Sequence, residues 1–212
     1  MDSSRLPGKA LLPLNGKPII FRVMEALNQI PADLRILACP DDSLAVFSPI
    51  AEEADFKIHA GPKEDVLERF CQVIRRFRID RVIRATGDNP FVFTDAAIAI
   101  NEEAVSLNAD YAGYLELPYG AGVESVSAAA LQRAVVDGAS AFDREHVCPF
   151  LYNNKNMYKL HRPIAPEKWR FPDLRLTIDT QEDYENAVKL YDALKNEPNR
   201  FHGERIIFRR EL

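Results

Sequence analysis

The sequence predicts an α/β fold in which a mainly parallel sheet is covered by helices on both faces. Short β-like runs alternate with amphipathic helical runs along most of the chain, and alternation at this spacing favours a parallel sheet. The 212 residues contain no internal repeat, low-complexity tract or Gly/Ser linker. We therefore expect one domain over residues 1–212, long enough to bury a substantial core.

The expected elements follow from hydrophobic periodicity and from capping residues. A first helix is expected over 18–28, where apolar residues recur at helical spacing after a proline. A strand over 34–39 follows, and Asp42 or Ser43 can cap a helix that runs to about Ala54. Further strands are expected at 56–59, 81–85, 111–114, 123–126 and 174–178, and further helices at 65–76, 95–108, 128–136, 144–152 and 181–195.

Composition excludes several classes of protein. The net charge is −5, from 27 Lys and Arg against 32 Asp and Glu, which is a poor match for the phosphate backbone of nucleic acid. No apolar stretch approaches the ~20 residues that cross a bilayer, and no signal-peptide segment is seen. The cysteines Cys39, Cys71 and Cys148 lack metal-binding spacing, so we expect reduced thiols and a cytoplasmic protein without membrane partners.

Parallel sheets bind ligands beyond the carboxyl ends of their strands, so functional residues are expected in the loops that leave the strands. The loop nearest the N-terminus holds two small hydroxyl residues, a glycine that permits close backbone approach, and three cations. These groups suit a triphosphate, although an exposed Pro-Gly turn with solvated charges is the alternative. The residues are Ser3, Ser4, Arg5, Gly8, Lys9 and Lys17.

Two aspartates each follow a predicted strand. Asp88 lies in Thr-Gly-Asp-Asn-Pro, and Asp179 lies in Leu-Thr-Ile-Asp-Thr. Carboxylates at strand ends can hold Mg²⁺ through single oxygens and leave its other positions to water and phosphate. Turn chemistry is the alternative for Asp88, while a capping box accounts for Thr180 and Asp183 but leaves Asp179 unexplained.

Two further loops carry weaker signals. A Gly-Pro loop enters a helix near Lys63 and Asp65, although capping by Asp65 explains most of that pattern. In Asp-Arg-Glu-His-Val, an aspartate can cap a helix that contains Arg144 and Glu145. His146 can serve as a general base, but a lone histidine is more often structural.

Taken in order, these segments resemble the spore coat polysaccharide biosynthesis cytidylyltransferases, which are similar to the synthetases that make CMP-activated 3-deoxy-manno-octulosonate and sialic acid. The resemblance runs from Ser3 to Asp183. It rests on the motifs Ser-Arg-Leu-Pro-Gly-Lys, Gly-Lys-Pro, Glu-Asp-Val-Leu-x-Arg, Thr-Gly-Asp-x-Pro, Arg-Glu-His-Val and Leu-Thr-Ile-Asp-Thr-x-Glu-Asp.

The resemblance implies a Rossmann-like nucleotidyltransferase fold, a three-layer sandwich, and transfer of CMP from CTP to a sugar with Mg²⁺. Arg5 and Lys9 would grip the CTP phosphates with Lys17 close by, and Asp88 and Asp179 would bind the metal. The remaining nucleotide-binding residues would be Ser3, Ser4, Gly8, Lys63 and Asp65, and the sugar side would include Glu124, Arg144 and Glu145.

The chain departs from the family pattern in two places. The family has a β-strand before the first motif, so we expect a sheet that lacks its first, central strand and a natural start upstream of Met1. Near Glu124, Ala121 and Gly122 stand where related chains often carry an acidic or polar residue. These small residues leave a less polar wall, so the sequence does not identify the sugar acceptor.

The sequence is also compatible with two other functions. The first is a sugar-1-phosphate nucleotidyltransferase that uses another nucleoside triphosphate, and the second is a truncated, non-catalytic nucleotide-binding protein. A glycosyltransferase would ordinarily show an Asp-x-Asp metal site after a strand, and none is present. The sequence leaves a homodimer open.

Overall fold

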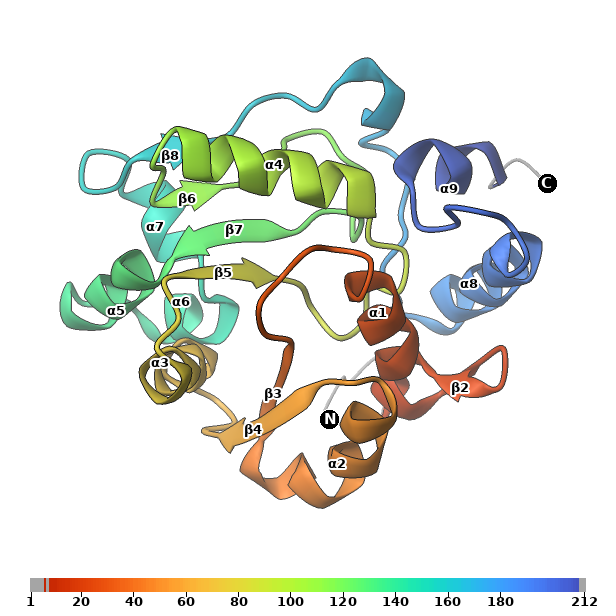
Figure 1. Ribbon diagram of the computed structural model, residues 1–212, viewed down its shortest axis with the longest axis horizontal. Coiled ribbons are helices and arrows are strands. Elements are labelled where there is room, and N and C mark those ends of the chain that lie inside the picture. The colour runs from red at the N-terminus through yellow and green to blue at the C-terminus, as the bar shows by residue number, and fades with distance from the viewer. Residues whose placement is uncertain (1–5, 7, 210–212) are drawn as a thin grey trace.

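The computed structural model describes Leu6 and residues 8–209, and the expected alternation of strands and helices is present (Figure 1). The strands are β1 (Pro13–Leu14), β2 (Lys17–Pro18), β3 (Ile36–Pro40), β4 (Lys57–Gly61), β5 (Arg81–Arg84), β6 (Tyr111–Ala112), β7 (Glu124–Ser127) and β8 (Leu160–His161). The α-helices are α1 (Ile19–Leu27), α2 (Leu44–Glu53), α3 (Val66–Phe77), α4 (Thr94–Ser106), α5 (Ala128–Val136), α6 (Ala141–His146), α7 (Pro149–Asn153), α8 (Gln181–Leu194) and α9 (Gly203–Arg209). Three short 3₁₀ helices are η1 (Lys9–Leu11), η2 (Asp41–Ser43) and η3 (Glu167–Trp169).

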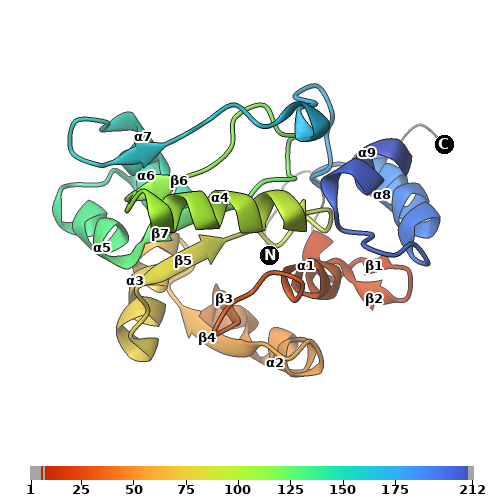
Figure 2. The same ribbon diagram turned by 45° about the horizontal axis from the view of Figure 1, so that its top comes forward.

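The core lies on both faces of the strands because neighbouring strand residues point to opposite sides. In β6, Tyr111 packs into an apolar cluster with α3, α5 and α7, while Ala112 packs into a second cluster with α4. Helix α4 therefore covers one face and α3 and α5 cover the other, which is the predicted three-layer arrangement (Figure 2). A third cluster joins α1, α8 and α9 around Phe91, Phe93 and Trp169.

The strands form mixed sheets, because one strand of the larger sheet, β7, runs opposite to the other three, while β6 and β8 pair in parallel. Strands β3 and β4 pair in parallel, but β7 runs antiparallel to both β5 and β6 in a sheet of order β5-β7-β6-β8. The chain reaches β7 from β6 through a loop without a helix, and such a loop returns the chain in the opposite direction. The helical crossover α4 keeps β5 and β6 in the same direction.

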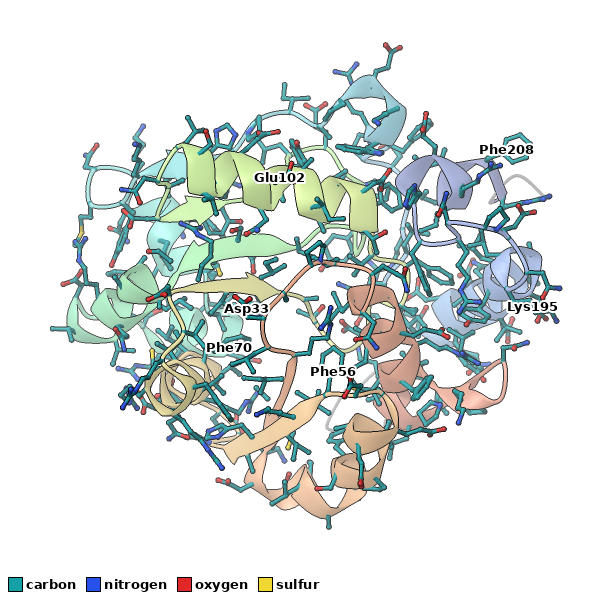
Figure 3. The ribbon with its side chains drawn as sticks, in the orientation of Figure 1. Asp33, Phe56, Phe70, Glu102, Lys195 and Phe208 are labelled. Carbon is teal, nitrogen blue, oxygen red and sulfur yellow. The ribbon has the colours of Figure 1, made fainter. Side chains whose placement is uncertain are left out.

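The facing edges of β3 and β5 have no strand partner among the described residues, as expected for a sheet without its central strand. A cavity of about 400 Å³ lies between these strands. Phe56, beside β4, and Phe70, on α3, both line it and are labelled in Figure 3. Arg35, Arg69 and Arg84 also line the cavity, and the Nε atom of each is buried without a hydrogen-bond partner.

Two expected elements differ from the structure. The helix expected over 144–152 is broken into α6 and α7, because Pro149 supplies no N–H and Val147 adopts a positive φ of 75°. Ser140, rather than Asp143, is the N-cap of α6, and Asp143 completes its capping box. The strand expected over 174–178 is an extended segment with one isolated bridge, from Tyr119 to Arg175.

No helix in the described part of the chain combines the length and the apolar character needed to span a bilayer.

Candidate active site around Lys9, Asp88 and Asp179

Asp88 lies in the turn that follows the carboxyl end of β5. The Thr86 hydroxyl donates a hydrogen bond of 2.8 Å to Asp88 Oδ1, and the Asn89 side chain donates to Thr86 Oγ1 at 2.8 Å. A backbone hydrogen bond from Asn89 to the Thr86 carbonyl closes the turn. The turn therefore holds one carboxylate oxygen of Asp88 and leaves Oδ2 for other contacts.

Asp179 is brought beside Asp88 by backbone pairing of the extended segment that precedes α8. The Leu176 N–H donates to the Tyr119 carbonyl at 2.8 Å, and the Ile178 N–H donates to the Asp88 carbonyl at 3.0 Å. Ile178 is fully buried, so its apolar side chain anchors the segment in the core. The segment thus fixes Asp179 next to the Asp88 turn although the two residues are far apart in the chain.

Gly120 is required where this segment passes the loop between β6 and β7. Its φ is 93°, a conformation that L side chains rarely adopt. An added Cβ would lie 2.6 Å from the backbone nitrogen of Thr177. The close approach of these two backbones positions the chain that leads into Asp179.

Asp183 and Arg175 hold the other side of Asp179. The Asp183 side chain accepts hydrogen bonds of 2.9 Å from the backbone N–H groups of Asp179 and Thr180, in the capping box that begins α8. Arg175 donates to Asp183 Oδ1 at 3.0 Å and to Asp179 Oδ2 at 2.5 Å. Burial alone would raise the pKa of Asp183, but these hydrogen bonds hold it below its usual value.

Lys9 joins the two aspartates. It begins η1 directly after Gly8, which has a left-handed φ of 67°. The Lys9 ammonium lies 2.6 Å from Asp88 Oδ2 and 2.7 Å from Asp179 Oδ1. Burial lowers the pKa of Lys9, but the hydrogen bonds and charges of Asp179 and Asp88 outweigh burial and raise it above the usual value. The three predicted residues therefore meet at one point.

The loop after β4 lies at the start of α3, as the sequence predicts. Asp65 caps α3 by accepting the Glu68 N–H at 3.0 Å, and its second oxygen forms an ion pair of 2.5 Å with Arg144. Lys63 lies 3.5 Å from Asp42. The residues predicted for the nucleotide and sugar sides, Asp65 and Arg144, are thus in direct contact with each other.

Glu124 faces a polar network inside the sheet. Its carboxylate pairs with Arg84 across β5 and β7 and accepts a hydrogen bond of 3.1 Å from the Tyr111 hydroxyl. Cys148 lies against the same carboxylate, and burial followed by the charge of Glu124 raises its pKa well above the usual value. These contacts supply a structural role for Glu124 besides the predicted contact with substrate.

The other predicted site residues have separate positions. Glu145 lines the cavity between β3 and β5, which Thr86 and Gly87 of the Asp88 turn also line. Lys17 forms an ion pair with Glu53 and lies over the Phe21 ring, and it makes none of the Lys9 contacts described above. Ser3, Ser4 and Arg5 lie outside the described residues.

Thr86 and Arg175 are not predicted from the sequence, although each contacts one of the two predicted aspartates, Asp88 and Asp179. A signal for Arg175 was present, because Leu174, Leu176 and Ile178 alternate with it and put Arg175 on the same side of an extended chain as Asp179. Thr86 stands two residues before Asp88, where a hydroxyl can bond to the acidic side chain of a turn.

Sequence comparison assigns nearly the whole chain to one group of proteins. A family model described as cytidylyltransferase matches residues 1–206. The spore coat polysaccharide biosynthesis protein SpsF of Bacillus subtilis (strain 168) is 32% identical over 206 residues, which cover 94% of this chain and 86% of that protein.

Solved structures share the architecture. A cytidylyltransferase from Leptospira borgpetersenii serovar Hardjo-bovis matches with a TM-score of 0.88 at 21% identity, over 97% of this chain and 88% of that one. The CMP:2-keto-3-deoxy-manno-octonic acid synthetase solved with CTP matches with a TM-score of 0.68 at 17% identity, over 90% and 94% of the two chains. These matches confirm the predicted nucleotidyltransferase fold.

Proposed function

Because the chain belongs to the cytidylyltransferase family, we propose that it transfers CMP from CTP to a sugar, releases pyrophosphate and serves surface polysaccharide or glycan biosynthesis. The observation that carries the proposal is the meeting of Lys9, Asp88 and Asp179 at one point. A cation beside two carboxylates suits a reaction in which a metal-bound triphosphate gives up its outer phosphates.

The residues present fit Mg²⁺. Asp88 Oδ2 and Asp179 Oδ1 converge on the Lys9 ammonium, so the position between them already accommodates a positive charge. Magnesium binds through one or two carboxylates and keeps waters and substrate phosphates as its other ligands.

When bound, Mg²⁺ would neutralise negative charge on the phosphate oxygens and orient them. Lys9 stabilises the negative charge of the departing pyrophosphate, and we assign Arg5 the same role. Gly8 gives the phosphates close access to the backbone, and Asp88 and Asp179 hold the metal-binding oxygens in place.

The reaction is an in-line displacement at the α-phosphorus of CTP. A bond forms between an acceptor oxygen of the sugar and the α-phosphorus, and the bond to the pyrophosphate oxygen breaks. The acceptor proton is released to solvent. As in other phosphoryl transfers, positioning and charge stabilisation supply most of the rate enhancement.

On the sugar side we propose Glu124, Arg144 and Glu145. Glu145 supports this assignment, since it is exposed and lines the cavity that reaches the Asp88 turn. On the nucleotide side we propose Lys17, Lys63 and Asp65, with Ser3 and Ser4 preceding the phosphate loop.

A pyrophosphate-release assay tests the proposal. The purified protein is incubated with Mg²⁺, each of CTP, UTP, GTP and ATP, and an acceptor panel of 3-deoxy-manno-octulosonate, N-acetylneuraminate and sugar 1-phosphates. We expect release with CTP, dependent on an acceptor. Release of pyrophosphate with another nucleotide and a sugar 1-phosphate would show that the protein is a sugar-1-phosphate nucleotidyltransferase. Binding of CTP without release of pyrophosphate would indicate a non-catalytic nucleotide-binding protein.

A further inference from the structure

The two aspartates use their oxygens in the same way. Asp88 accepts a hydrogen bond from the Thr86 hydroxyl at Oδ1 and one from Lys9 at Oδ2. Asp179 accepts a hydrogen bond from Arg175 at Oδ2 and one from Lys9 at Oδ1. In each carboxylate one oxygen is held by a protein donor and the other is turned toward the common point.

Arg175 lies partly exposed at the surface, yet its side chain contacts Asp183, Asp179 and Tyr119. Its Nε donates to Asp183 at 3.0 Å, its Nη2 donates to Asp179 at 2.5 Å, and its guanidinium lies 5.0 Å from the centre of the Tyr119 ring. The side chain is 41% exposed, and ion pairs at such exposure contribute little to folding stability. A guanidinium that bridges two carboxylates does fix their orientation, because its donors have a rigid planar arrangement.

We propose that Arg175 is a positioning residue that makes Asp179 a single-oxygen metal ligand in the cytidylyl transfer proposed above, on which this inference rests. Arg175 occupies Oδ2, so only Oδ1 faces the metal position. Asp183 keeps Arg175 in place and holds the backbone N–H of Asp179. Thr86 is the counterpart that restricts Asp88.

Single-oxygen coordination has a chemical consequence. Mg²⁺ requires near-octahedral geometry and short bonds, whereas the larger Ca²⁺ accepts both oxygens of one carboxylate. A restrained Asp179 therefore favours Mg²⁺, and release of Oδ2 permits the two-oxygen contact that Ca²⁺ tolerates. Metal selectivity is thus the property that distinguishes positioning from simple support of the fold.

Arg175→Lys and Arg175→Ala test the proposal. Lysine keeps the charge but is a point donor that does not span Asp179 and Asp183 in the same way. We expect the Mg²⁺ concentration for half-maximal rate to rise ~10-fold or more, the usual effect of losing a partner of a metal ligand. The rate should recover at saturating Mg²⁺, Ca²⁺ should compete more effectively, and methylguanidinium should partly rescue Arg175→Ala.

Arg170→Lys is the matched control, because Arg170 has a similar exposure of 43% and its only described ion pair, with Glu116, is 4.0 Å long. It should leave the Mg²⁺ requirement and the Mg²⁺/Ca²⁺ preference unchanged. Thr86→Val, which removes the hydroxyl but keeps the shape, should shift the Mg²⁺ requirement as Arg175→Lys does. If Arg175→Lys and Arg175→Ala both keep the wild-type Mg²⁺ requirement and metal preference, Arg175 does not position Asp179.

Electron paramagnetic resonance of Mn²⁺ with CTP separates this inference from the proposed function. Wild-type binding of Mn²⁺ and CTP without turnover would reject the transfer reaction, while weaker Mn²⁺ binding in Arg175→Lys would still support positioning. Equal binding in both proteins would overturn positioning. Absence of Mn²⁺ and CTP binding to the wild type would overturn both.

Discussion

At the scale of single residues, the site depends on which carboxylate oxygen of each aspartate is hydrogen-bonded to a neighbouring side chain. Asp88 and Asp179 both contact Lys9, yet each has its second oxygen bound by a neighbour, Thr86 or Arg175. The balance of charge is therefore one ammonium and one guanidinium against the three carboxylates of Asp88, Asp179 and Asp183. Substitutions that keep shape but remove charge are the most informative here.

Asp88→Asn should lower turnover by at least ~100-fold, the scale of losing one main electrostatic element of an active site. Asparagine keeps the size of the side chain but removes the charge that pairs with Lys9 and that we propose for metal binding. The measurement is the initial rate of pyrophosphate release at saturating CTP. Asp33→Asn is the control, because Asp33 is exposed on the loop between α1 and β3 (Figure 3). Near-normal turnover of Asp88→Asn would remove Asp88 from the mechanism.

The three cysteines should be unreactive in the native protein. All are free and buried. Burial raises the pKa of Cys71 to about 11 and also raises that of Cys39, while burial and Glu124 raise that of Cys148. Because the thiolate is the reactive form, iodoacetamide at pH 8 should label them slowly in the native state and fully in guanidinium chloride. Rapid native labelling of any cysteine, read by mass spectrometry, would contradict this expectation.

Residue patterns singled out Asp88 and Asp179 as carboxylates that follow predicted strands and Lys9 as a cation in a glycine-containing loop, and the family resemblance implied their roles. They did not predict Thr86 or Arg175, because each acts through a contact whose geometry depends on the folded turn. The pairing of Asp65 with Arg144 was also beyond prediction, since it joins two helices that are distant in the chain.

At the scale of elements, helices with strong periodicity were predicted closely. Helix α5 spans Ala128–Val136 as expected, and α8 begins at the predicted capping box. The segment 174–178 is predicted as a strand because it alternates apolar residues, but it forms one isolated bridge, from Tyr119 to Arg175, and a few backbone hydrogen bonds instead of a continuous ladder. Local alternation does not reveal whether a partner strand is available along the whole length.

Gly120→Ala should destabilise the protein more than Gly138→Ala. Both glycines have positive φ, 93° and 100°, so both substitutions carry a conformational cost of ~1–2 kcal/mol. Only at Gly120 does the new Cβ meet a backbone atom, at 2.6 Å, whereas Gly138 has no atom within 4 Å. An overpacking cost of ~2 kcal/mol then lowers the Tm by ~4–8 °C relative to Gly138→Ala.

Differential scanning calorimetry of the two variants measures this difference, and the pyrophosphate assay measures its effect on the site. Displacement of Thr177 should move Asp179 and reduce activity in Gly120→Ala alone. Equal melting temperatures would show that the backbone contact with Thr177 has no energetic role.

At the scale of the whole molecule, layer architecture followed from the alternation of strands and helices, but the antiparallel direction of β7 did not. Strand β7 lies between β5 and β6, and its antiparallel course depends on a loop that contains no helix. Local sequence patterns do not show which strands pair or in which direction, because the pairing joins residues that are distant in sequence. The polar network of Arg84, Glu124 and Tyr111 is a result of that same order.

Stability should fall as pH rises above about 10. Burial raises the pKa of Tyr158 and Tyr191 to about 12, with added contributions from Asp137 and Glu25 respectively. In the unfolded chain these phenols ionise near ~10, so between about pH 10 and 12 the unfolded state binds fewer protons and the free energy of unfolding decreases with pH. Urea denaturation at pH 8, 9, 10 and 11, with tyrosinate absorbance, measures the effect. Ionisation of both tyrosines near pH 10 in the folded protein would contradict it.

Lys9 also bears on the order in which ligands arrive. An ammonium tethered between Asp88 and Asp179 is present at a high effective concentration, so a dissolved divalent ion competes poorly for the same oxygens. A triphosphate changes this competition, since its phosphate oxygens offer Lys9 an alternative partner and carry the divalent ion with them. Calorimetric titration with MgCl₂ alone should therefore yield little heat, while titration with MgCl₂ in the presence of CTP should saturate, giving the enzyme an ordered encounter in which metal and nucleotide enter together.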